Sequence, residues 1–287
     1  MAHVFEIIRR RVRLVYEPER ARRWTILTRS LEDSVNALSA MFPVGEAFFC
    51  RSVAHYRDRI TDPVLREQVA DFIFQEAMHS KEHKRFNDAL READVMGQEI
   101  ETVARVLLNM AERFYPPITR LAVTCALEHC TTMLSATLLE HRALWDKHTD
   151  DEFGKLWLWH AAEEIEHKAV CFDVYEHIYG TGFWAWVHRV GVMGSVTLFG
   201  TMGILVAFAM ASAKSARQRR EACAKEAAAP GRTGPRLRPI FAAMSWKTYR
   251  DYYRRDFHPS RHDHHALLEA WKKENPGFGA QADPQAA

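Results

Sequence analysis

Apolar side chains recur along most of the chain at the three- and four-residue spacing of amphipathic helices. The pattern predicts an all-α fold with helices over 24–40, 44–59, 63–94, 99–115, 117–148 and 152–178, and short helices over 245–257 and 266–274. Asp62 and Pro63 predict one helix start, because Asp caps an N-terminus and Pro suits the first helical position. Pro43 and Gly45 predict a break between the first two helices.

A second pattern covers residues 190–213, which contain no charged side chain. As a helix, these 24 residues would extend about 36 Å, enough to cross a bilayer. Trp184 and Trp186 precede the stretch, and four basic residues follow at 214–220. Three interpretations stay open: a membrane span, a helix lying on the membrane surface, and a buried helix in a large helical domain or a homodimer.

Charge divides the chain further. Residues 214–287 hold 15 Lys and Arg against 8 Asp and Glu, a net +7, while the preceding residues hold 24 against 29, a net −5. Together with the proline- and glycine-containing segment 224–239, this predicts three parts: a helical bundle over 1–180, a long apolar helix over 181–223, and a basic linker and tail over 224–287. No nucleic-acid motif accompanies the basic tail, which suits an anionic membrane surface.

Cysteine usage and the N-terminus bear on the compartment. The five cysteines are an odd number without a C-x-x-C pair, which is typical of reduced thiols. The first 23 residues contain arginines throughout and no uninterrupted apolar segment, so no secretory signal peptide is predicted. We expect a cytoplasmic protein, attached to the inner face of the membrane if the apolar helix engages lipid.

Two helical segments carry metal-binding chemistry. One reads E-x-x-H-x-x-x-H and the other H-x-x-x-E-x-x-H. On a helix, residues three and four apart share a face, so each segment presents two imidazoles and a carboxylate together. The residues are Glu76, His79 and His83 in the first segment, and His160, Glu164 and His167 in the second. Glu163 also precedes His167 by four residues, so the choice of glutamate stays open.

A dinuclear carboxylate site in a helical bundle needs two further glutamates from flanking helices. Glu46 lies beside Phe42, Phe48 and Phe49, and Glu128 interrupts an otherwise apolar helical stripe. A buried carboxylate needs a partner, which makes both of them candidate ligands.

With these motifs, the chain resembles the predicted metal-dependent hydrolases of the ferritin-like superfamily, including its Phe42-Pro43-Val44-Gly45-Glu46 segment and its late Phe257-His258-Pro259. The site also resembles the histidine-rich di-iron site of the p-aminobenzoate N-oxygenase type. These resemblances imply a ferritin-like four-helix bundle with extra helices. The second resemblance implies the ligands Glu46, Glu76, His79, Glu128, His160, Glu164 and His167. His83 lies outside that pattern and is an extra ligand or a supporting group.

Four carboxylates and several imidazoles suit two iron ions, with manganese or zinc as alternatives. Our preferred prediction is a di-iron enzyme that activates oxygen, with an unknown reductant, to oxidise a small and hydrophobic, even lipid-like, substrate. The first alternative is a hydrolase that uses a metal-bound hydroxide. The second is a non-catalytic ferritin-like module that binds metal.

Overall fold

The computed structural model describes residues 5–222 and 245–279. Within them the fold is all-helical and contains no strand, only an isolated bridge between Thr25 and Thr149. The α-helices are α1 (Pro18–Ala21), α2 (Arg29–Ala54), α3 (Pro63–Glu92), α4 (Glu99–Phe114), α5 (Pro117–Glu140), α6 (Arg142–His148), α7 (Asp151–His167), α8 (Val170–Tyr179), α9 (Phe183–Ala222), α11 (Trp246–Asp251) and α12 (His265–Glu274). Short 3-10 helices cover Arg57–Arg59 and Pro259–Arg261. The predicted all-α class is confirmed.

Capping explains where two of the central helices begin. The Asp62 carboxylate accepts hydrogen bonds from the N–H groups of Val64 and Leu65, and Pro63 occupies the first helical position of α3. Asp150 caps α7 in the same way, through Glu152 and Phe153. Both caps fix the register of helices that carry the metal-binding motifs.

The predicted break at Pro43 is wrong, because α2 runs without interruption from Arg29 to Ala54 with Pro43 inside it. A proline in a helix interior removes one backbone hydrogen bond, but surrounding contacts can satisfy the freed carbonyl. Here the freed carbonyl belongs to Ser39, and it accepts a hydrogen bond from Asn87 of α3 instead. Two other predicted helices are divided, at His141 and at 168–169.

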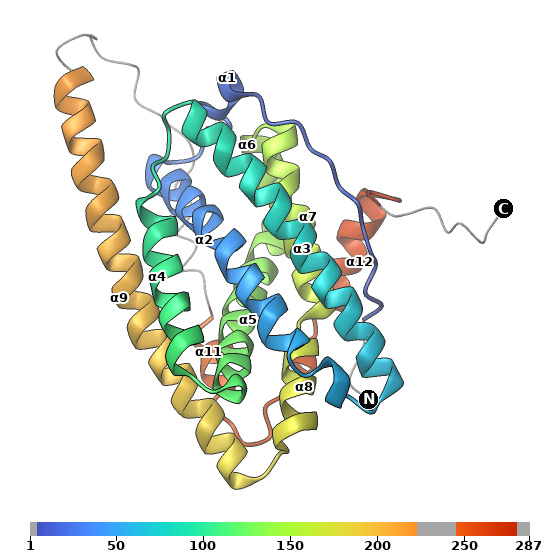
Figure 1. Cartoon of the computed structure of the whole chain (residues 1–287). Helices are drawn as coiled ribbons and strands as arrows, with labels where there is room; N and C mark the ends of the chain where they lie inside the picture. The colour runs from blue at the N-terminus through green and yellow to red at the C-terminus, as the bar shows by residue number, and fades with distance from the viewer. Residues whose placement is uncertain (1–4, 223–244, 280–287) are drawn as a thin grey trace.

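Four helices, α2, α3, α5 and α7, lie side by side and enclose the predicted ligands (Figure 1). α2 packs along α3, while α5 packs along α7 and its continuation α8. One apolar cluster, containing Trp24, Phe86 and Trp159, lies toward one end of this group. A second cluster, containing Phe48, Phe72 and Phe172, lies toward the other end. The predicted ligands are therefore placed between two blocks of packed apolar side chains.

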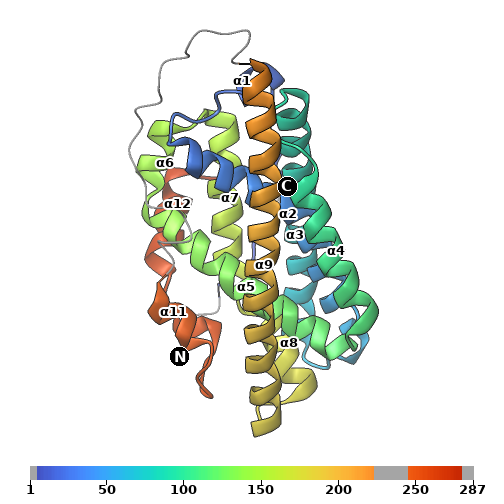
Figure 2. The same cartoon turned by 90° about the vertical axis from the view of Figure 1, so that its left-hand side faces the viewer.

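A long helix, α9, follows residue 180 and lies along α4 and α5 on the outside of the group (Figure 2), but its predicted apolar, membrane-type character is not supported. Val192 and Met193 are buried against the bundle. Among the described residues, no helix combines the length and the hydropathy that crossing a membrane requires. The predicted span is thus not supported within the described residues, which leave out the side chains of residues 204, 207–208 and 210–213 of this stretch.

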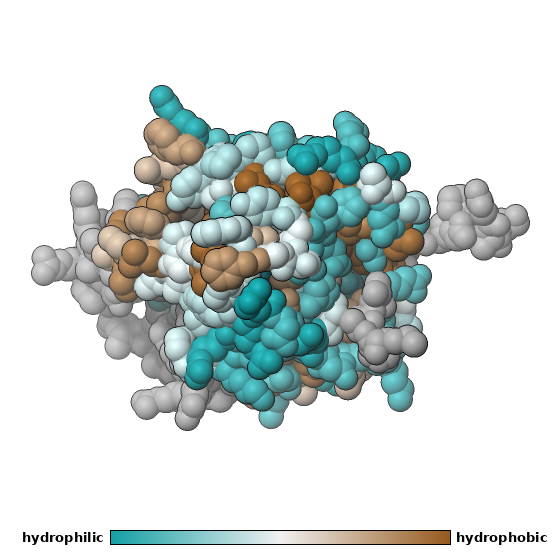
Figure 3. Space-filling model, turned by 90° about the horizontal axis from the view of Figure 1, so that it is seen from below, coloured by the Kyte–Doolittle hydropathy of each residue, from teal (hydrophilic) through white to brown (hydrophobic). Residues whose placement is uncertain are grey.

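One face of α9 exposes apolar side chains, including Leu198, Phe199 and Leu205. Trp184, near its beginning, is 73% exposed, and Trp246 of α11 is 68% exposed. Seen from that end of the bundle, separate apolar patches interrupt a mostly hydrophilic surface (Figure 3). Contact of α9 with a membrane surface or with a second copy stays a prediction, as do the predicted domain boundaries after 180 and 223.

Candidate metal centre

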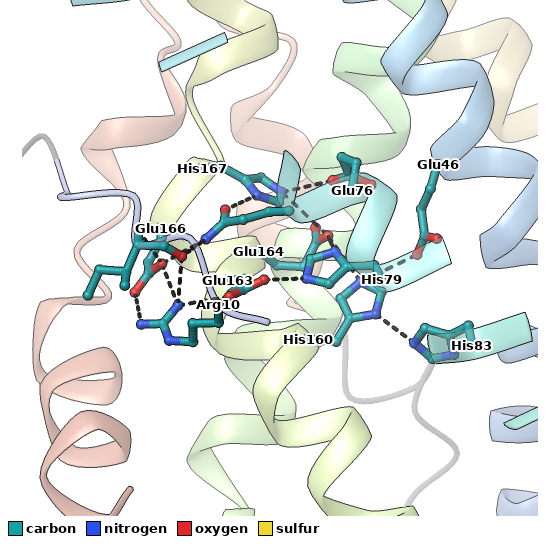
Figure 4. Close-up of polar contacts among 12 residues, drawn as sticks. Arg10, Glu46, Glu76, His79, His83, His160, Glu163, Glu164, Glu166 and His167 are labelled. Atoms are coloured by element: carbon teal, nitrogen blue, oxygen red, sulfur yellow. Dashed lines mark hydrogen bonds and ion pairs between the residues drawn. The ribbon is translucent and has the colours of Figure 1, made fainter. Parts of the chain in front are cut away.

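The structure brings all eight predicted residues into one buried cluster. Figure 4 shows these residues apart from Glu128. Each of four helices contributes: Glu46 from α2, Glu76, His79 and His83 from α3, Glu128 from α5, and His160, Glu164 and His167 from α7. Helical spacing explains the convergence, because the three motif residues of α3 and of α7 share one face. The lone glutamates of α2 and α5 enter from the flanking helices, as predicted.

One half of the cluster is rich in carboxylates. Glu76, Glu128, Glu164 and His167 offer ligand atoms within 4.8 Å of one another. His167 Nε2 lies 3.1 Å from the Glu76 carboxylate and 3.5 Å from those of Glu128 and Glu164. This half fits a hard divalent cation that prefers oxygen ligands.

The other half is rich in imidazoles. His160 Nε2 lies 3.1 Å from Glu164 Oε1 and 3.9 Å from Glu46 Oε1. His79 Nδ1 is 3.9 Å from the same Glu164 oxygen, and the His79 and His160 rings stack at 4.1 Å. Glu164 therefore belongs to both halves, and Glu76 also reaches both, because it groups with Glu46 and His79.

Buried polar atoms of this cluster lack the hydrogen bonds that a folded interior normally supplies. Both carboxylate oxygens of Glu46, Glu76 and Glu128 have no hydrogen-bond partner, and neither do Glu164 Oε2, His79 Nδ1 and His167 Nε2. Buried polar groups without hydrogen bonds are rare and costly. A cluster of this many converging hydrogen-bond acceptors therefore needs an explanation. Lone pairs that point at a common centre are the donor set of a metal site.

The pKa values of the carboxyls follow from their crowding. Burial raises the pKa of Glu46 and Glu128 well above the ordinary value, and repulsion from the neighbouring carboxylates adds to this effect. Glu164 differs: burial acts to raise its pKa, but His167 and His160 hold it well below the ordinary value. Of the four cluster carboxyls, Glu164 alone has imidazole contacts that outweigh the effect of its burial on its pKa. Two divalent ions would compensate all four.

His79 and His167 are oriented from behind by a charged network that the sequence did not reveal. His79 Nε2–H donates to Glu163 Oε2 at 2.9 Å, so its Nδ1 faces the cluster. His167 Nδ1–H donates to Gln75 Oε1 at 2.8 Å, so its Nε2 faces the cluster. The sequence left open whether Glu163 or Glu164 is the candidate ligand. In the structure Glu164 points into the cluster, whereas Glu163 lies behind His79 and points away from it.

Arg10 connects Glu163, which contacts His79, to Glu166, which contacts Gln75, within this charged network. Its guanidinium donates to Glu163 at 3.0 Å and, through two nitrogens, to Glu166 at 2.7 and 2.8 Å. Gln75 Nε2 also donates to Glu166, which fixes the Gln75 amide with its oxygen toward His167. These side chains are buried. Arg10 belongs to the N-terminal arm, residues 5–16, which runs along α3 (Figure 1). The arginine-rich start was the only sequence signal for this role.

Aromatic rings enclose the histidines. Trp159 contacts His79 edge-on at 4.9 Å, Phe72 contacts His167 at 4.9 Å, and Phe42 contacts His160 at 4.8 Å. A cavity of about 170 Å³ lies beyond Glu166, lined by Lys168 and Asp173 among others. None of the eight cluster residues lines this cavity. The cluster itself is therefore shielded from solvent by apolar contacts.

The fold and the cluster together define an all-helical protein with a buried carboxylate–histidine centre of the metal-binding type. Comparison with protein families gives the particular family: residues 8–263 match the family described as predicted metal-dependent hydrolase, and the chain belongs to it. No curated protein and no solved structure matches the chain. The family description favours the hydrolase alternative of the sequence analysis over oxygen activation, which the comparisons do not support.

Proposed function

We propose that the protein is a metal-dependent hydrolase with a dinuclear centre. The observation that carries this proposal is the convergence of unsatisfied carboxylate oxygens and imidazole lone pairs on one buried point. The family description supports the reaction class. One glutamate from each of α2 and α5, with E-x-x-H pairs on α3 and α7, also supports a ferritin-like bundle.

Seven residues would hold the two ions: Glu76, Glu128, Glu164 and His167 on the carboxylate-rich half, and Glu46, His79 and His160 on the other, with Glu164 and Glu76 available to both. When bound, divalent ions supply Lewis acidity and a water molecule of lowered pKa, which hydrolysis of an ester or amide requires. The protein's part is to orient the imidazoles through Glu163 and Gln75 and to exclude bulk water with the surrounding rings.

The test begins with metal content. The full-length protein is stripped with chelator and loaded with Mn²⁺, Zn²⁺ or Fe²⁺, and bound metal is measured by mass spectrometry. We expect two ions per chain, and hydrolysis of at least one member of a panel of esters, amides and phosphate esters by the loaded protein. Glu164→Gln should abolish both properties. Two bound ions without turnover of any panel member would favour a non-catalytic metal-binding module.

Oxygen activation is the second candidate. The observation that favours it is the imidazole-rich half with its stacked His79 and His160, because nitrogen ligands suit redox-active iron. The Fe²⁺-loaded protein separates the candidates: oxygen uptake in proportion to bound iron supports oxidation, while hydrolysis with Zn²⁺ or Mn²⁺ and no oxygen uptake supports the hydrolase.

A further inference from the structure

Pro43 changes which hydrogen bonds α2 can make. In an α-helix each carbonyl accepts from the N–H four residues later. Pro43 has no N–H, so the Ser39 carbonyl loses its helical donor. The side-chain amide of Asn87, on α3, supplies a replacement, with Nδ2 2.8 Å from the Ser39 carbonyl oxygen.

This contact fixes the direction of the Asn87 amide. Because Nδ2 faces the carbonyl, Oδ1 faces the Ser39 hydroxyl, 2.6 Å away. An amide oxygen only accepts, so the hydroxyl donates its hydrogen to Asn87. The Ser39 oxygen is then left to accept from His83 Nδ1, at 2.8 Å. His83 therefore carries its proton on Nδ1.

The proton position on His83 determines the proton position on His160. A neutral His83 with its proton on Nδ1 has a lone pair on Nε2, and this atom lies 2.7 Å from His160 Nδ1. His160 Nδ1–H must donate to it, which leaves the lone pair of His160 on Nε2, facing Glu164 and Glu46. The opposite direction needs a second proton on His83. Neither hydrogen-bond partner of that buried ring carries a negative charge to compensate it.

We propose that His83 is a positioning residue, and not a metal ligand, that presents the unprotonated Nε2 of His160 to the metal centre. The proposal rests on the proposed function, because it assigns a role toward the ions of that site. The direction of the chain Asn87–Ser39–His83–His160 originates at Pro43, whose missing N–H orients Asn87. We call this chain the neutral network.

The other ligand histidines show the same arrangement with different acceptors. Glu163 accepts from His79, Gln75 accepts from His167, and His83 accepts from His160. Although a ring nitrogen of His83 lies within 4.8 Å of ligand atoms of Glu46 and His160, both of its nitrogens are already hydrogen-bonded. Metal binding by His83 would break the contact that orients His160.

Histidine ring ¹⁵N NMR tests the proton positions directly, on full-length protein with and without Zn²⁺. We expect His83 with its proton on Nδ1 and a metal-free Nε2, and His160 with its proton on Nδ1 and zinc on Nε2. Zinc on His83 Nε2, or a proton on His83 Nε2, would overturn the proposal. His83→Gln identifies the His83 signals by their disappearance.

Zinc affinity, measured by chelator competition, tests the functional consequence. His83→Leu removes the acceptor, and we expect the affinity for one of the two ions to fall about 10–100-fold. His83→Gln keeps an oxygen acceptor near the position of Nε2, so it should restore most of that loss. The control is His188→Gln, which removes a ring that bonds to Tyr175 and Thr119 and does not belong to the cluster. Wild-type affinity in His83→Leu contradicts the proposal.

Pro43→Ala separates positioning from packing. The restored N–H competes with Asn87 for the Ser39 carbonyl, so zinc affinity should fall about tenfold. The thermal stability of the zinc-free protein should not fall, because alanine is the better residue for a helix interior. Unchanged zinc affinity in this variant would place the origin of the chain's direction elsewhere and overturn that part of the proposal.

The zinc experiments distinguish failure of the proposed dinuclear centre from failure of the positioning role of His83. Wild-type protein that binds no zinc defeats the dinuclear centre, and with it the role of His83 toward the ions. Two bound zinc ions with His83 among their ligands defeat only the positioning role. In either case the ¹⁵N spectra of the zinc-free protein still read the direction of the hydrogen-bond chain.

Discussion

The histidines that we propose as metal ligands are held by two networks that differ in charge and in origin. The charged network joins Arg10 of the N-terminal arm to Glu163 and Glu166 of α7, more than 150 residues away in the sequence. The neutral network joins Asn87 and His83 of α3 to Ser39 of the neighbouring α2. One network contains a buried cation and two buried carboxylates, while the other contains no formal charge.

The difference teaches how each network fails. A buried charge whose partner is removed costs far more than a lost neutral hydrogen bond. The charged network also depends on docking of the arm, since Ile8 and Leu14 bond through their backbones to Glu166 and Glu82. Apart from its last member, His160 of α7, the neutral network lies within the α2–α3 pair. We therefore expect the charged network to dominate stability and the neutral network to act mainly on metal affinity.

The largest effect is expected from Arg10→Met, which leaves Glu163 and Glu166 buried without their cation. We expect the free energy of unfolding to fall by about 3–5 kcal/mol. Urea denaturation followed by circular dichroism measures it. The matched control is Arg9→Met, because Arg9 pairs with Asp71 at the surface and is 44% exposed. Such a pair contributes about 0–1 kcal/mol. Equal losses in the two variants would contradict the charged network's role.

Glu164→Gln acts where the two halves of the cluster meet. Glu164 lies in both halves of the cluster, near His160 on one side and His167 on the other. Losing a supporting group costs about 10–100-fold in metal affinity, and losing this shared ligand should cost more. Metal content after gel filtration should fall to background while the helical circular dichroism is kept. Stoichiometric metal in this variant would remove Glu164 from the ligand set.

The motifs predicted much of this arrangement because they depend on local helical geometry. Spacing alone placed Glu76 with His79, and Glu164 with His167, on inward faces, and the apolar context singled out Glu46 and Glu128. The neutral network was not predictable in that way. It depends on Pro43 remaining inside a helix, whereas its sequence signal indicated a break.

The contacts between the N-terminal arm and α7 could not be predicted from the sequence for a different reason. Arg10 reaches Glu163 only because the arm packs along α3, and no periodicity encodes that contact. The lack of charge in residues 190–213 predicts a helix long enough to span a membrane, but among the described residues no helix meets the length and hydropathy that a span requires. The Arg10 contacts depend on tertiary packing, which a local pattern of residues does not contain.

Ser39→Ala tests the neutral network from its middle. It leaves His83 Nδ1 and Asn87 Oδ1 without partners, which should lower the free energy of unfolding by about 1–3 kcal/mol and zinc affinity about tenfold. Ser52→Ala is the matched control on α2, since the Ser52 hydroxyl bonds to Phe49 and Thr124 instead. The control should lose about 1 kcal/mol of stability and no zinc affinity. Equal zinc affinities in the two variants would argue against the network.

The smallest effect is expected for the share of the pH dependence of stability that comes from His264, which lies beside the charged network. α12 begins directly after His264 and brings Lys272 within 3.5 Å of Glu166. Burial lowers the pKa of His264 to about 3, with repulsion from Lys168 and His262 adding to it and Asp263 opposing it. Lys168 also contacts His264 Nδ1 at 3.3 Å, so protonation there would separate the two groups.

Between the ordinary histidine pKa of about 6.5 and the folded value, the unfolded chain binds the extra proton, so stability falls as the pH falls through this window. From pH 7 to 5.5 the loss attributable to His264 should be about 1 kcal/mol, and His264→Gln should remove that share of the slope. Urea denaturation of both proteins at the two pH values measures the difference. An identical slope would mean that His264 is accommodated with its proton, and that α12 supports Glu166 independently of pH.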